Sequence, residues 1–167
     1  EQRIHFDELS VATEYGSFQM TGQGYLKDLR NGLPEVILAQ FQLENLEANL
    51  DDVFDRPVTL DGGAIDLRME LNPFALDIGQ VMLRQGDDHL RARGKVSAGP
   101  GGWQVSVDAG LDQMRSENLL ALWPVAVSKN TRTWLADNIQ DGVIGPANAA
   151  FRLAQGEKPV VSLQFGF

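Results

Sequence analysis

Residues 115–145 read RSENLLALWPVAVSKNTRTWLADNIQDGVIG, and their periodicity differs from that of the rest of the chain. On both sides of this segment apolar and polar residues alternate with a period of two, which is typical of strands with one buried face. Within the segment the apolar residues recur at the longer spacing of a helix. We therefore expect a helical plug at about residues 115–141, laid over a β-sheet.

The ends of two short helices are predicted inside this plug. Ser116 is placed to cap a first helix, which Pro124 prevents from continuing. Ser128 is placed to cap a second helix and Gly142 to end it. One face of the second helix is formed by Trp134, Leu135, Asn138 and Ile139. Because a tryptophan lies on that face, we expect Trp134 to be the side chain that anchors the helix to the sheet.

The alternating segments outside the plug predict about ten strands, at the spacing of roughly 8–12 residues that is typical of all-β proteins. Short turns join them, so the expected topology is an antiparallel meander that forms a curled sheet within a single domain, residues 1–167. Asn31-Gly32 is a strong turn signal, and Asp61-Gly62-Gly63 indicates a hairpin. At Asn45 the alternation slips by one residue, which a β-bulge or a turn would explain.

The composition restricts the partners of this domain. The net charge is −9, from 14 basic and 23 acidic side chains, which argues against nucleic acid as a partner. The absence of cysteine excludes disulfides and thiolate metal sites. No apolar run reaches the roughly 18 residues that a membrane span needs, and no signal peptide opens the chain. We expect the chain to be a piece of a longer protein.

Several polar residues could in principle perform chemistry, but none forms a catalytic motif. His5 and His89 lie on polar strand positions far apart in sequence, and the paired aspartates lie in turns, where aspartate is favoured. The basic row Arg91, Arg93 and Lys95 is expected to pair across the sheet with acidic residues such as Asp66 and Glu70. We therefore expect no enzymatic activity, no cofactor and no metal ion. A carbohydrate-active enzyme remains an alternative, and it would need two converging carboxylates.

The most prominent feature is the amount of apolar alternation. In a closed sandwich two such faces bury each other, whereas in a curled open sheet the concave face can accept acyl chains. The sequence pattern is the same in both cases, so a lipid groove and a purely structural or protein-interaction module both stay open. The candidate residues for lining a groove are Ile37, Phe41, Ile65, Leu67, Val105 and Val107.

Part of the plug resembles a known family. The residues concerned are Trp123, Pro124, Arg132, Trp134, Leu135, Asn138 and Gly142. They resemble the "WP … R-x-W-L … N … G" stretch of the AsmA-like proteins of Gram-negative envelopes, in particular the central domain of the YhdP-type members, a domain of unknown function. The specific part of this resemblance covers about 20 residues, and the flanking strands fit the family in general character.

The resemblance implies a location and a role. AsmA-like proteins are held to be anchored in the inner membrane, to extend into the periplasm as a β-rich groove, and to take part in moving phospholipid toward the outer membrane. It therefore implies a non-enzymatic segment whose partners are phospholipid acyl chains and neighbouring segments of the same long chain. It assigns no catalytic role to Arg132 or Trp134. We expect Arg132 to satisfy carbonyl groups or an acid, as a structural residue does.

Overall fold

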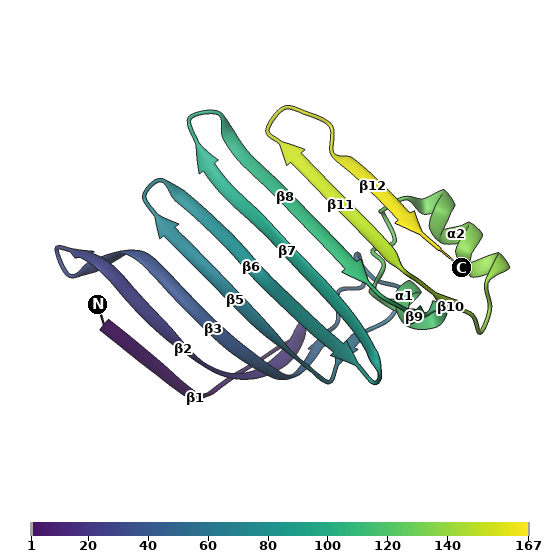
Figure 1. Cartoon of the computed structure of the whole chain (residues 1–167), viewed down its shortest axis with the longest axis horizontal. Helices are drawn as coiled ribbons and strands as arrows, with labels where there is room; N and C mark the ends of the chain where they lie inside the picture. The colour runs from purple at the N-terminus through teal and green to yellow at the C-terminus, as the bar shows by residue number, and fades with distance from the viewer. Residues whose placement is uncertain (1, 167) are drawn as a thin grey trace.

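The computed structural model of the chain describes residues 2–166, so Glu1 and Phe167, the ends of the expected domain, lie outside the described residues. The protein is mainly β, with 65% of its residues in strands and 10% in helices, which confirms the predicted fold class. Figure 1 shows a single curled sheet with two short helices at one end. The strands are β1 (Gln2–Thr13), β2 (Gly16–Arg30), β3 (Leu33–Ala48), β4 (Val58–Leu60), β5 (Gly62–Leu71), β6 (Phe74–Gln85), β7 (Asp88–Gly99), β8 (Gly102–Leu111), β9 (Met114–Arg115), β10 (Val143–Ile144), β11 (Ala147–Ala154) and β12 (Val160–Phe165). The helices are α1 (Ser116–Leu122) and α2 (Lys129–Asn138).

The sheet is an antiparallel meander, as predicted. Its strands follow the order β1-β2-β3-β5-β6-β7-β8-β11-β12, with β4 paired to β3, while β9 and β10 form a separate two-stranded ladder. Asn31 and Gly32 form the turn between β2 and β3, and both have the positive φ that the tightest hairpin turns require. A bulge lies where the alternation slips, because Asn45 pairs with Gln19 whereas Leu43 pairs with Met20.

The predicted hairpin at Asp61-Gly62-Gly63 is wrong. β4 and β5 do not pair with each other; both pair antiparallel with β3, so the chain only bends between them. The Asp61 carboxylate accepts a hydrogen bond from the backbone N–H of Gly86, at 2.5 Å between Oδ2 and N. This contact binds the bend to the turn between β6 and β7, and the glycines continue the strand instead of reversing it.

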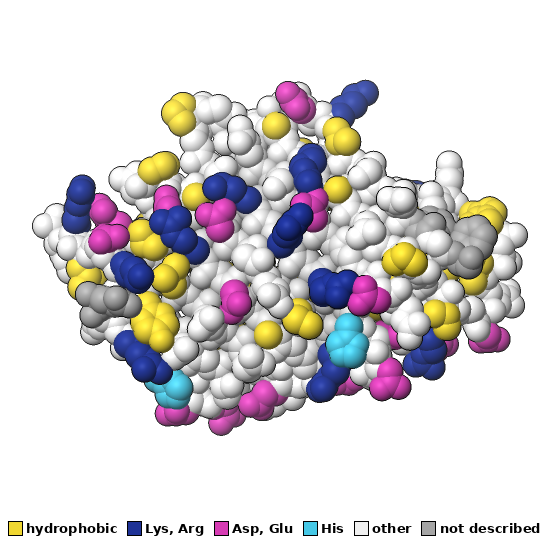
Figure 2. Space-filling view, viewed as in Figure 1, with side chains coloured by type: hydrophobic (Ala, Val, Ile, Leu, Met, Phe, Trp, Pro, Cys, Tyr) yellow, Lys and Arg dark blue, Asp and Glu magenta, His cyan; other side chains and the backbone are white. Residues whose placement is uncertain are grey.

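The strand register places apolar side chains on one face of the sheet. Residues that pair directly across antiparallel strands share a face. One such row runs across six strands and contains Phe41, Ile65, Val81, Ala92, Ala109 and Ala149. The opposite face bears charges of both signs, which Figure 2 shows spread over the side turned to the viewer, together with some apolar side chains such as Leu38 and Met82. The sheet therefore has one mainly apolar face across these six strands and an opposite face that carries most of the charges.

The apolar face is the inner face of the curl. The sheet is not closed into a barrel, and in Figure 1 part of β1 passes behind the ends of β5 and β6. Some inner-face positions are too crowded for a side chain. A Cβ atom added at Gly22 would lie 2.3 Å from the carbonyl oxygen of Gln40 and 2.6 Å from Cδ1 of Phe41. Glycine here lets β2 and β3 bend tightly while the Phe41 ring covers the gap.

Replacement of Gly22 by alanine is expected to destabilise the protein by about 1–3 kcal/mol, because the added methyl group overpacks a rigid backbone. The matched control is Gly24→Ala on the same strand and face, where an added Cβ would meet nothing closer than 3.8 Å. Thermal or denaturant unfolding of both variants measures the difference. Equal stability of the two variants would mean that β2 and β3 do not approach as closely as described.

The fully buried core lies between the plug and the sheet. One cluster joins Leu111, Met114 and Ala147, and a second joins Trp123, Leu135 and Ile144. Leu135 is 1% exposed, whereas Trp134 is 44% exposed. The prediction that Trp134 anchors the second helix is therefore wrong, since α2 presents Leu135 to the core. A helix turns by about 100° per residue, so two adjacent side chains do not face the core together.

The predicted helix ends are only partly right. Arg115 occupies the N-cap of α1, and Ser116 is its first, buried residue. Ser128 occupies the N-cap of α2, but its backbone is left-handed and its side chain makes no capping hydrogen bond. α2 ends at Asn138, before Gly142. Packing against the sheet, more than capping, therefore sets the ends of these short helices.

The basic row pairs across the charged face, but with other acids than expected. Lys95 contacts Asp77 at 3.1 Å, and Arg91 contacts Asp112 at 2.5 Å. Arg93 lies 3.6 Å from Asp108, which also pairs with Arg152. Glu70 pairs instead with Arg68, at 2.6 Å. The row is therefore part of a solvated ladder of ion pairs.

Asp108 makes this ladder sensitive to acid. The hydrogen bond from Arg152, with the charges of Arg152 and Arg93, lowers the pKa of the Asp108 carboxyl below its ordinary value. A carboxyl whose pKa is lower in the folded state stabilises the fold above its unfolded pKa, about 4, and loses this contribution as pH falls below it. We expect Asp108→Asn to lower the melting temperature at neutral pH, with a difference from wild type that shrinks in acid. A difference independent of pH would contradict this assignment.

Candidate apolar groove and its plug

The six candidate groove residues lie together on the inner face. Phe41 pairs directly with Ile65, and Leu67 pairs with Ala39, while Ile37 lies on the same side of β3. Val105 and Val107 occupy the same face of β8. Despite a bulge in β6, the pairs Leu67–Ile78, Ile78–Gly94 and Gly94–Val107 carry this face from β5 to β8. All six side chains are half-buried. The sheet that carries them is not closed into a barrel, and their half-buried side chains leave this apolar face partly accessible.

The plug closes one end of this face by reaching the loop after β3, residues 49–57. The backbone N–H of Val125 donates to the carbonyl of Val53 at 2.9 Å. The guanidinium of Arg56 donates to the carbonyl of Glu117 at 2.6 Å. In the sheet β3 and β8 are separated by three strands. The plug and this loop therefore form a bridge across the end of the curl.

Arg132 holds this bridge together. Its guanidinium donates to the carbonyls of Trp123 at 3.4 Å and Leu120 at 3.3 Å, and it forms an ion pair with Asp55. The Arg132 side chain is only 16% exposed. The prediction that Arg132 satisfies carbonyls or an acid is confirmed, and the side chain does both. Its acidic partner lies 77 residues away in sequence, and no local pattern identified it.

Other residues of the motif that resembles the AsmA-like family pack or form hydrogen bonds within the plug. Trp123 is buried, and its indole N–H donates to the carbonyl of Val127 at 2.7 Å. Pro124 begins a turn that Val127 closes by donating to its carbonyl. The Asn138 side chain donates to the carbonyl of Trp134 at the end of α2. Gly142 accepts from the backbone N–H of Ser116 at 2.8 Å, which links the start of α1 to the segment after α2.

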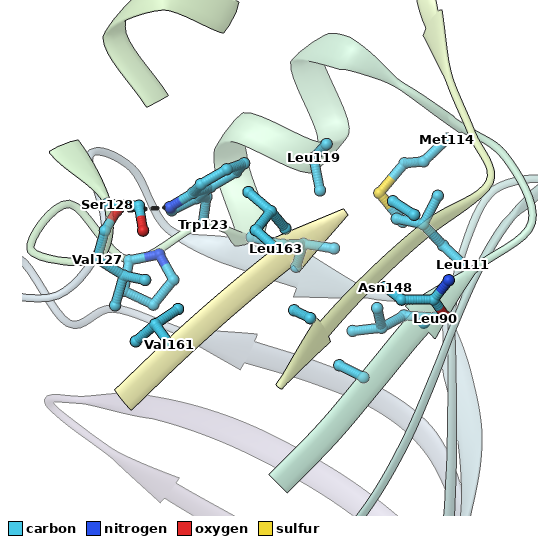
Figure 3. Close-up of a pocket in the computed structure, with 16 residues that line it drawn as sticks. Leu90, Leu111, Met114, Leu119, Trp123, Val127, Ser128, Asn148, Val161 and Leu163 are labelled. Atoms are coloured by element: carbon cyan, nitrogen blue, oxygen red, sulfur yellow. Dashed lines mark hydrogen bonds between the residues drawn. The ribbon is translucent and has the colours of Figure 1, made fainter. Parts of the chain in front are cut away.

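An apolar cavity of about 230 Å³ lies between the plug and the inner face. Figure 3 shows side chains of β11, β12 and the plug pointing into it, with Trp123 and Leu163 on one side and Leu111 and Met114 on the other. The sheet side of this cavity contains Ala109, Ala147 and Ala149. Small side chains under the plug thus leave a hollow where larger ones would fill the space.

The two histidines each lie beside a residue that is close in sequence. His5 faces Asp7 at 3.2 Å on the surface, and His89 lies beside the carbonyl of Asp87. Asp88 is buried and accepts a hydrogen bond from the side chain of Asn118 at 2.6 Å, so it joins the start of β7 to α1. Within residues 2–166 no group of three or more metal-ligating side chains comes together.

Sequence reasoning missed three parts of this site: the alanines beneath the plug, the loop at residues 49–57, and the buried pair of Asp88 and Asn118. Two adjacent aspartates such as Asp87 and Asp88 are typical of a turn, and only the tertiary structure shows that Asp88 points inward to α1. The alternation of apolar and polar residues correctly predicted which side chains share a face of the sheet. It does not distinguish a small apolar residue such as alanine from a large one such as leucine, so it could not predict a cavity. The small side chains indicate a cavity only when the strand register shows that they lie next to one another.

No protein-family model, curated protein or solved structure matches this chain. In the part of the chain that the structure describes, no helix is long and apolar enough to cross a membrane.

Proposed function

We propose that this chain is a lipid-handling segment without enzymatic activity, in which the inner face of the sheet holds acyl chains. The proposal includes the setting that the motif resemblance implies, a periplasmic AsmA-like protein anchored in the inner membrane that takes part in phospholipid transport to the outer membrane. The supporting observation is the continuous apolar face on an open sheet, with Phe41, Leu67 and Val107 only half-buried.

Such a face favours lipid tails over ligands with many polar groups. Each methylene group removed from water contributes about 0.8 kcal/mol, so a long chain is held without a pocket for its headgroup. The inner face is formed largely by Leu, Ile, Val, Phe and Ala. We therefore expect broad selectivity among phospholipids and strong sensitivity to charge placed on this face.

A charge on the inner face is expected to weaken lipid binding. Val105→Glu places a carboxylate between Val96 and Leu153, its cross-strand neighbours. Since burial of an unpaired charge costs several kcal/mol and about 1.4 kcal/mol is a factor of ten, binding of a fluorescent phospholipid should weaken more than tenfold. The matched control is Gln104→Glu, which adds the same charge to the other face at the next residue, where the native side chain is exposed.

The two variants separate the functional alternatives. Weakened binding in Val105→Glu alone supports the lipid-handling proposal, provided that circular dichroism shows both variants folded. Equal binding by both variants would mean that lipid does not occupy the inner face. If the wild-type chain binds no lipid at all, the chain is better described as a structural or protein-interaction module.

A further inference from the structure

The cavity beneath the plug is lined by plug residues on one side, and its sheet side continues into the inner face. On the plug side Leu119, Trp123 and Val127 line the cavity. The hydrogen bond between Val125 and Val53 and the ion pair between Arg132 and Asp55 hold this part of the plug to the loop at residues 49–57. In the other direction, the floor at Ala109 continues along β8. Val105 lies four residues further along, on the same face and at about 3.4 Å per residue. A chain lying along β8 therefore ends under the plug.

The lining of the cavity is almost wholly apolar, and its polar side chains are those of Trp123, Ser128 and the solvent-exposed Asn148. The indole N–H of Trp123, the largest polar side chain there, is already bonded to Val127. Among the described residues the buried side-chain polar atom without a partner is Oε1 of Gln85, which lies outside the lining. Burying a polar group without a partner costs free energy. The cavity therefore favours a hydrocarbon end over a charged or hydrogen-bonding one.

The volume of the cavity restricts the occupant further. About 230 Å³ is less than the roughly 300–1,000 Å³ that encloses a whole drug-sized ligand. It has room for the end of one chain, whose remaining length must lie on the open inner face. We propose that this cavity is an end stop that binds the methyl end of a single acyl chain. The proposal rests on the proposed lipid-handling function and adds a direction to it, because the headgroup then points away from the plug.

Tryptophan fluorescence tests this orientation directly. The chain has three tryptophans, of which Trp123 lines the cavity while Trp103 and Trp134 are exposed. The double variant Trp103→Phe, Trp134→Phe leaves Trp123 as the reporter. Two probes are compared, both stearoyl monoglycerides: one carries bromine atoms near the methyl end of the acyl chain, and the other carries them near the ester. A monoglyceride is neutral, so the net charge of −9 on the protein does not repel it. Bromine quenches a tryptophan only on close approach.

We expect the probe brominated near its methyl end to quench Trp123 severalfold more strongly than the probe brominated near its ester. In the same background, Ala149→Leu should fill the cavity and remove most of this quenching. The matched control is Ala150→Leu, the next residue on the opposite face, which should leave the quenching unchanged. If circular dichroism shows that Ala149→Leu is unfolded, the milder Ala109→Val replaces it.

Equal quenching by both probes, or quenching unaffected by a folded cavity-filling variant, overturns the end-stop assignment. No quenching of Trp123 by either probe, while lipid binding remains sensitive to Val105→Glu, overturns the end stop and leaves the proposed function standing. If the chain binds neither monoglyceride nor phospholipid, the proposed function fails together with the end stop.

Discussion

Replacing Leu135 with alanine should lower the free energy of unfolding by about 2–5 kcal/mol, the usual loss for a buried leucine that leaves a cavity. Leu135 is 1% exposed and packs with Trp123 and Ile144 in the cluster that holds α2 to the rest of the protein. For a chain of this size, each kcal/mol corresponds to roughly 2–4 °C in melting temperature. Leu135→Ala should therefore melt clearly below the wild-type protein.

The control for this prediction is the neighbouring residue. Trp134 is the larger side chain, but it is 44% exposed, so Trp134→Ala should cost less than half as much as Leu135→Ala. Denaturant unfolding measures both, and an unchanged slope with denaturant shows that only stability has changed. A larger loss in Trp134→Ala would mean that α2 is rotated relative to the described packing.

Trp134 and Leu135 show that a helical pattern predicts where a helix lies but not which of two adjacent apolar residues faces the core. The spacing correctly predicted helices within residues 115–141, because apolar residues recur there with a helical period. It did not predict which residue faces the core, since Trp134 and Leu135 are adjacent and both apolar. The orientation of α2 is set by its contacts with Ile144 and Trp123, which come from outside the helix.

For the strands, too, the sequence predicted the elements better than their contacts. Alternation and the turn at Asn31-Gly32 predicted the meander, because both depend on residues close in sequence. The joint between β4 and β5 was wrong, since glycine and aspartate allow a bend as readily as a reversal, and the partner strand decides between them. The open curl was left undecided for a physical reason: alternation is identical in a closed and an open sheet.

Contacts between distant segments could not be predicted at all. Arg132 was expected to need an acid, but nothing near it in sequence pointed to Asp55 in the loop after β3. That loop, residues 49–57, contains turn-forming residues with no pattern of their own. The bridge over the end of the sheet depends on this pairing.

Photocrosslinking should show an all-or-none difference between the two faces of the sheet. A photoreactive side chain placed at Phe41, Leu67 or Val107 lies on the inner face, on three different strands. The neighbouring positions Gln40, Asp66 and Ser106 lie on the same strands and face the other way. Because each pair is adjacent in sequence, differences in expression or in local flexibility affect both members alike.

The most direct test of an acyl-chain face is to irradiate cells that produce these six variants and to identify the crosslinked molecules by mass spectrometry. The account predicts phospholipid adducts at Phe41, Leu67 and Val107, and none above background at Gln40, Asp66 and Ser106. Adducts with protein at the inner positions, or lipid adducts equally frequent on both faces, would contradict it.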